Sequence, residues 1–127
     1  TAARAHDLRA HAVAQLPALA DRLSAGGLDE AAGPWDIVIN ATSGSLSDTP
    51  PDLPAGLYAR GALAYDMVYA AVPTAFLRQA RDQGATQTAD GLGMLVGQAA
   101  AAFGIWHGIT PQVQSVLEAL RRELHYT

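Results

Sequence analysis

The chain has 127 residues, of which half are hydrophobic and 16% are charged, with a formal net charge of −4 and no cysteine. The length is that of one domain, and the mildly acidic balance disfavours nucleic acid and anionic membranes as partners, because neither attracts a surface of like charge. Disulfides, thiolate chemistry and cysteine-ligated zinc are excluded, as is typical of a cytoplasmic protein. All eight basic residues are arginine, so a catalytic lysine would have to come from outside this chain.

The first third of the chain is predicted to hold a helix and then a strand. Residues 1–11 are typical of a helix that begins at or before its first residue, with Leu8 on the inner face. Pro17 interrupts the leucine spacing that follows, so the segment up to Gly33 fits a short strand with a helix, or two helices. Residues 35–40 form an apolar β-branched run without alternation, which indicates a parallel strand covered on both faces.

Loop, strand and helix signals alternate through the middle of the chain. Serine, aspartate, proline and glycine predict a loop over residues 44–54, and a second strand fits residues 61–67. A helix is expected from Pro73 to Gln83, ended by Gly84, and a short third strand over residues 85–89. This alternation predicts an α/β fold with a parallel sheet.

Two helices are expected at the carboxyl end. Residues 92–107 predict a helix without charged side chains, in which Gln98 is the one polar group before the final histidine. Spanning a membrane takes about 20 apolar residues, so a buried helix that packs closely through Gly93 and Gly97 is the favoured interpretation. Residues 111–124 have the spacing of an amphipathic helix.

The glycines at 91, 93 and 97 imitate a dinucleotide-binding fingerprint, but their spacing differs from it by one residue. We therefore expect the backbone of Gly91 to lie against a flat ligand group, with close helix packing as the alternative. Asp90 is predicted to be the N-cap of the helix. The Gln98 amide, expected to be buried, must bond either to backbone or to a ligand.

Polar groups follow two of the predicted strands. Asn40 ends the first, with Thr42 and Ser43 just beyond it, and Asp66 lies at the end of the second, with Tyr69 just beyond it. Open α/β sheets bind ligands beyond the carboxyl ends of their strands, although turn chemistry alone also explains these residue types. The coincidence at two strand ends favours a ligand site there.

The four histidines show no metal-ligand spacing and no triad with serine and aspartate, so neither a metal site nor a hydrolase is expected. His107 is expected to cap the carboxyl end of the uncharged helix, where a donor is favourable.

Four blocks of the sequence, in order and in spacing, resemble shikimate dehydrogenase. They are Asp-Ile-Val-Ile-Asn-Ala-Thr-Ser at 36–43, Tyr-Asp-Met-Val-Tyr at 65–69, Thr-Ala-Phe-Leu at 74–77, and Ala-Asp-Gly-Leu-Gly-Met-Leu-Val-Gly-Gln-Ala-Ala at 89–100. Residues 1–5 are similar to the end of the family's Asn-Arg-Thr-x-x-Arg motif. Trp-His-Gly at 106–108 and the closing helix resemble the carboxyl end of the family.

The resemblance implies an enzyme that reduces 3-dehydroshikimate to shikimate with NADPH, between an amino-terminal substrate domain and a Rossmann-like cofactor domain. Residues 1–127 would then be the carboxyl-terminal part of the cofactor domain, a partial doubly wound parallel sheet followed by a helical segment. The substrate domain and the first βαβ unit would be absent from this chain, which leaves residues 35–40 at an unpaired edge.

The resemblance also assigns roles to individual residues. Those expected to bind NADP are Thr1 and Arg4 at the adenosine 2′-phosphate, Asn40, Thr42 and Ser43 along the cofactor, and Met67, Gly91 and Met94 at the nicotinamide. Tyr69 and Gln98 are expected to bind the substrate, shikimate or 3-dehydroshikimate.

Several departures bear on activity. Ala75 stands where the family usually has proline. The family's amino-terminal Ser-x-Ser substrate motif, its catalytic lysine and aspartate pair and its glycine-rich phosphate loop would all belong to the absent part of the enzyme. No catalytic residue is therefore expected in this chain, and the chain alone is predicted to be inactive. The alternatives are a non-catalytic dinucleotide-binding or interaction module, or a relative that acts on quinate.

Overall fold

The computed structural model describes residues 1–125, except for the side chains of residues 45, 46 and 125. Strands and helices alternate over most of this range, which confirms the α/β class. The elements in chain order are α1 (Ala2–Gln15), the 3-10 helix η1 (Pro17–Leu19), β1 (Trp35–Asn40), the 3-10 helix η2 (Ser43–Ser47), β2 (Tyr58–Asp66), α2 (Ala75–Asp82), β3 (Gln87–Ala89), α3 (Leu92–His107) and α4 (Val113–His125).

The three strands form one parallel sheet in the order β1-β2-β3. In the register of the sheet, Ile39 pairs with Tyr65, and Tyr65 pairs with Ala89. The last residues of β1 and β2, Asn40 and Asp66, also pair, so the two strands end at the same level. The parallel sheet expected from the sequence is confirmed.

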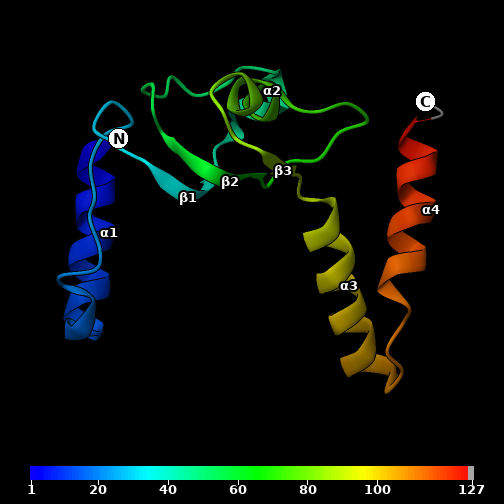
Figure 1. The fold of residues 1–127 in the computed structure, drawn as a ribbon. Coiled ribbons are helices and arrows are strands. Elements are labelled where there is room, and N and C mark those ends of the chain that lie inside the picture. The colour runs from blue at the N-terminus through cyan, green and yellow to red at the C-terminus, as the bar shows by residue number, and fades with distance from the viewer. Residues whose placement is uncertain (126–127) are drawn as a thin grey trace.

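The hydrophobic core lies between the sheet and α2, which covers one face of it (Figure 1). Thr74 is the N-cap of α2 and accepts a 3.4 Å hydrogen bond from the backbone N–H of Leu77. The helix therefore begins at Ala75, later than the predicted start at Pro73, because a threonine hydroxyl takes the capping position. The buried core side chains are those of Ala64, Phe76, Leu77, Ala80 and Ala85.

One face of β1 is left uncovered. The alternate side chains of Trp35, Ile37 and Ile39 are 47%, 60% and 61% exposed, whereas Val38 packs against the core. The expectation of a strand covered on both faces is therefore wrong for this chain, while its expected position at the sheet edge is confirmed. The reason is the placement of α1, which packs on η1 beside the sheet rather than on this face (Figure 1).

The placement of α1 also corrects a second expectation. Leu8, predicted to lie on the inner face of the helix, is 70% exposed. In the region up to Gly33 the structure has the short helix η1 and no strand. Arg9 fixes α1 to that region, because its guanidinium donates to the carbonyls of Leu23 at 2.6 Å and Ala20 at 2.8 Å.

Helices α3 and α4 form a hairpin that extends from the end of β3 away from the sheet (Figure 1). The predicted bounds of α3 are confirmed, and Gly108 ends the helix in the left-handed conformation with a φ of 69°. Its predicted burial is wrong, because Ile105 and Trp106 are 83% and 76% exposed. Only the face that contains Leu92, Val96 and Ala100 is buried.

The glycines of α3 do not provide the close packing that was predicted. A Cβ atom added at Gly93 or at Gly97 would meet no atom within 4 Å. Among the helices that the structure describes, none is both long enough and apolar enough to cross a membrane.

Candidate functional site

Asp66 joins the ends of two strands to the start of α2. Its side chain is completely buried, and its Oδ2 accepts a 2.6 Å hydrogen bond from the hydroxyl of Thr74. Its Oδ1 accepts the backbone N–H of Val68 at 3.1 Å and the side-chain amide of Asn40 at 3.4 Å. The carboxylate therefore fixes the carboxyl edge of the sheet, by which we mean residues 40–43 and 66–69.

Asn40 shapes the turn that follows β1. Its Oδ1 accepts hydrogen bonds from the backbone N–H of Thr42 at 3.0 Å and from the Thr42 hydroxyl at 2.7 Å. The Asn40 side chain is buried, while Thr42 and Ser43 are exposed. The turn chemistry that the sequence allowed is thus present, and it places the exposed residues 41–43 at the carboxyl edge.

Met67 and Tyr69, which follow β2, are 42% and 41% exposed at the same edge. Gly91 lies directly against this segment, since its N–H donates to the carbonyl of Val68 at 3.3 Å. A Cβ atom at position 91 would come within 2.0 Å of the Met67 carbonyl oxygen. Gly91 is buried in this chain, and its close approach to the Met67 backbone is what requires a glycine. Its contact with a ligand stays a prediction.

Met94 and Gln98 share one face of α3, because they are four residues apart in a helix. Met94 is 41% exposed, and Gln98 is exposed as well. The expectation of a buried Gln98 amide is wrong, since α4 covers the opposite, apolar face of α3. An exposed amide is hydrated and needs no bond to the core, and the contact of Gln98 with a ligand stays a prediction.

The prediction that Asp90 is the N-cap of α3 is wrong by one residue, because the N-cap is Gly91. Asp90 precedes it, and its Oδ1 accepts a hydrogen bond from the N–H of Leu92 at 3.2 Å. Both carboxylate oxygens also bind the guanidinium of Arg121 on α4, with Nη1 to Oδ2 at 2.7 Å. The hydrogen bonds to Asp90 raise the pKa of Arg121, which stays charged. Arg121 and Asp90 are 31 residues apart, so no local spacing in the sequence predicted this pair.

Thr1 is the N-cap of α1 and Arg4 lies in the first turn of that helix, and both are exposed. Figure 1 places this helix to one side of the sheet, so the structure does not bring these two residues together with the carboxyl edge. The contact that Thr1 and Arg4 are predicted to make with the cofactor therefore lies in a different place from the contacts predicted for Met67 and Met94.

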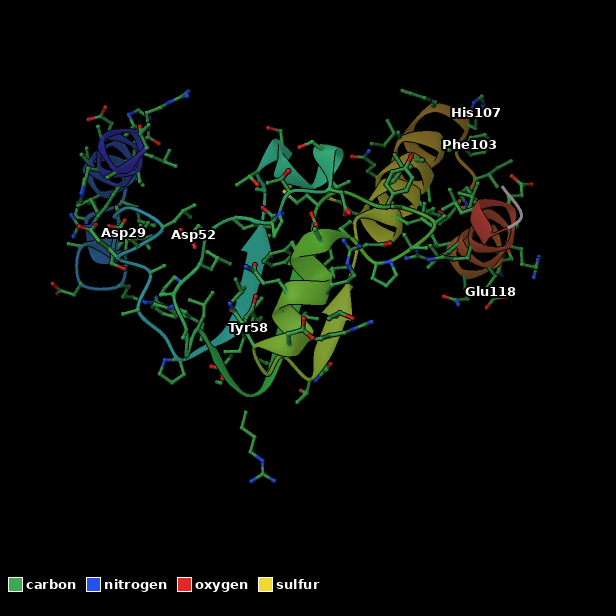
Figure 2. The ribbon with its side chains drawn as sticks, turned by 90° about the horizontal axis from the view of Figure 1, so that it is seen from above. Asp29, Asp52, Tyr58, Phe103, His107 and Glu118 are labelled. Atoms are coloured by element: carbon green, nitrogen blue, oxygen red, sulfur yellow. The ribbon has the colours of Figure 1, made fainter. Side chains whose placement is uncertain are left out.

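His107 is the last residue of α3, and its ring packs on that of Phe103 with the ring centroids 4.3 Å apart and the ring planes tilted by 38°. Figure 2 shows this pair on the hairpin, well separated from Tyr58 on the sheet. In the part of the chain that the structure describes, no group of three or more histidine, aspartate or glutamate side chains is placed to hold a metal ion.

Comparison with known proteins gives concordant matches. A family model described as the Shikimate 5'-dehydrogenase C-terminal domain matches residues 91–121. The shikimate dehydrogenase (NADP(+)) of Bordetella petrii is 59% identical over 126 residues, which cover 98% of this chain and 44% of that protein. The same enzyme of Bordetella avium is 68% identical over 101 residues, which cover 80% of this chain and 35% of that protein.

A solved structure gives the same result. Shikimate 5-dehydrogenase from Thermus thermophilus, crystallised in complex with NADP(H) and shikimate, is 38% identical, with a TM-score of 0.57. The match covers 68% of this chain and 33% of that chain. This chain therefore spans less than half the length of the relatives that it matches.

Proposed function

Because this chain matches the carboxyl-terminal portion of NADP(+)-dependent shikimate dehydrogenases, we propose that it is part of an enzyme that reduces 3-dehydroshikimate to shikimate with NADPH in the cytoplasm. The observation that carries the proposal is the 59% identity over 126 residues, which runs through the sheet, its carboxyl edge and the α3–α4 hairpin. A parallel sheet with polar groups beyond its strand ends also suits a nucleotide cofactor.

In this proposal residues 1–127 form the carboxyl-terminal part of a Rossmann-like cofactor domain and its helical extension. The remainder of the protein supplies the substrate domain and the first βαβ unit. Two exposed apolar surfaces support this division. One is the β1 face of Trp35, Ile37 and Ile39, and the other is the end of α3 at Ile105 and Trp106. Apolar surfaces of this kind are typical of faces that another part of a protein covers.

The proposed cofactor contacts lie in two places. The guanidinium of Arg4 and the hydroxyl of Thr1 are exposed at the start of α1, where they suit the 2′-phosphate that distinguishes NADP from NAD. Residues 40–43 border the cofactor, and Met67, Met94 and the segment at Gly91 flank the nicotinamide. The exposure of both methionines supports this placement, because a side chain can contact a ligand only where it is accessible.

Tyr69 and Gln98 are proposed to bind the polar groups of the substrate. Both side chains are exposed, one beyond β2 and the other on α3. NADPH, when bound, supplies the hydride for the ring ketone. This chain contains no lysine to transfer the accompanying proton, so its residues bind and orient while the acid–base group belongs to the remainder of the enzyme.

A chimera tests the proposal. Residues 1–127 replace the matching carboxyl-terminal residues of the Bordetella petrii enzyme, and shikimate-dependent reduction of NADP+ is followed by the absorbance of NADPH, with quinate as the comparison substrate. We expect turnover with shikimate. A folded chimera that neither binds NADP+ nor oxidises shikimate would overturn the proposal.

A further inference from the structure

The α3–α4 hairpin leaves the sheet at one short segment, residues 89–92, which connect β3 to α3. Arg121 reaches back to this segment from α4, so the chain contacts it a second time. Beyond this point α3 and α4 meet along an apolar groove lined by residues such as Leu95, Phe103 and Val116. Apolar contacts are not directional, whereas a guanidinium that binds both oxygens of a carboxylate has a defined geometry.

The carboxylate that Arg121 holds is itself joined to the start of α3. Asp90 Oδ1 accepts the Leu92 N–H, and the intervening Gly91 N–H donates to the Val68 carbonyl beyond β2. The Asp90 side chain is 11% exposed and that of Arg121 is 37% exposed. A pair this sheltered is less weakened by water and salt than a pair on the open surface.

We propose that Arg121 is a positioning residue of the enzyme. By holding Asp90 it fixes the direction in which α3 leaves the sheet, and it thereby sets the position of Met94 and Gln98 on α3 relative to Met67 and Tyr69 on the carboxyl edge. This inference rests on the proposed function, because it assigns these four side chains to the cofactor and the substrate. Arg121 itself touches neither.

Kinetics of the chimera provide the first test. Arg121→Gln is expected to raise KM for both NADP+ and shikimate by about tenfold while kcat changes by less than about twofold, because the two ligand-contacting faces are displaced together. Arg121→Lys, which keeps the charge but not the two-point geometry, is expected to give intermediate KM values.

Arg81→Gln is the matched control. Arg81 lines the same 250 Å³ pocket as Arg121, and its guanidinium donates to the Thr88 hydroxyl at 2.6 Å rather than to Asp90. It should leave both KM values unchanged. If Arg121→Gln lowers the maximal rate in proportion to the folded fraction while both KM values stay at their original level, the role of Arg121 is stability alone and the proposal is wrong.

A distance measurement separates this proposal from the proposed function. The measurement uses the chain of 127 residues, which has no cysteine of its own. Asp82→Cys on α2 and Ile105→Cys on α3 therefore provide two unique positions for spin labels, and both positions are exposed. Pulsed electron resonance should show that Arg121→Gln shifts or broadens the distribution of distances between the labels, and that Arg81→Gln does not. An unchanged distribution overturns the positioning role even if the chimera is active, and a changed one supports it even if the chimera is inactive.

Discussion

The hydroxyl of Thr74 donates a 2.6 Å hydrogen bond to Oδ2 of Asp66, and both side chains are buried. Asp66→Ala leaves several buried groups without this acceptor, so we expect it to lower the free energy of unfolding by about 2–4 kcal/mol. Thr74→Val keeps the shape but removes one bond and the cap of α2, and should cost about 1–2 kcal/mol. Urea unfolding of the chain measures both values. Equal stability of the Asp66→Ala variant and the parent chain would contradict the structural role of the carboxylate.

Replacement of glycine by alanine is expected to have opposite effects on stability at positions 91 and 97. Gly91→Ala would place a Cβ atom 2.0 Å from the Met67 carbonyl oxygen, and the backbone shift that follows should destabilise the chain by about 3 kcal/mol. Gly97→Ala meets no atom within 4 Å and should stabilise α3 by about 0.5–1 kcal/mol. Urea unfolding again provides the comparison, and equal midpoints for the two variants would show that the approach of Gly91 to Met67 is not tight.

The stability of the chain should carry an acid-sensitive contribution from Asp48. The hydrogen bond from Arg78, at 2.8 Å, lowers the pKa of the Asp48 carboxyl against an opposing effect of desolvation, and the N–H of Ala75 adds to the lowering. A lowered folded-state pKa favours folding above the ordinary carboxyl pKa of about 4, and this contribution is lost as the pH falls through the folded value.

Asp48→Asn isolates this effect, because asparagine tolerates the φ of 52° at this position. The variant should lose stability near neutral pH and converge with the parent chain in acid. The loss should be small and should shrink further in salt, because both side chains are largely exposed. If the difference in the free energy of unfolding between the variant and the parent chain stays constant as the pH falls, Asp48 does not make this contribution.

The proposed ligand contacts predict a division of kinetic effects in the chimera. Tyr69→Phe and Gln98→Ala should raise KM for shikimate by about tenfold, as expected for the loss of a hydrogen bond to a ligand, while KM for NADP+ changes little. Arg4→Ala should raise KM for NADP+ and leave KM for NAD+ unchanged, because NAD has no 2′-phosphate. An equal effect of Arg4→Ala on both cofactors would remove Arg4 from the phosphate site.

The sequence predicted where the helices and strands lie better than it predicted which of their faces are buried. Local signals lie within a few residues of one another, so the β-branched run at 35–40 and the glycine after His107 were enough to place β1 and the end of α3. Burial depends on what covers an element. The open face of Ile37 and Ile39 and the exposed amide of Gln98 were therefore predicted wrongly.

In the candidate site, too, local features were predictable from the sequence and contacts between distant residues were not. The carboxyl edge was predictable because parallel strands end together and polar residues follow them. The hydrogen bond of Asp66 to Thr74 and the ion pair of Asp90 with Arg121 were not, because they join residues that only the folded chain brings together. The sequence pattern drew attention to Gly91, but the backbone that requires a glycine there is that of Met67, which lies 24 residues away along the chain.

The most direct test compares the chain of 127 residues with the chimera at equal concentrations, in one assay of NADPH formation from shikimate and NADP+. Since residues 1–127 contain no lysine and are proposed to provide only the binding side of the site, the chain alone should form no NADPH and the chimera should form it steadily. Turnover by the chain alone, or none by a folded chimera, would contradict the assignment of binding to this chain and catalysis to the rest of the enzyme.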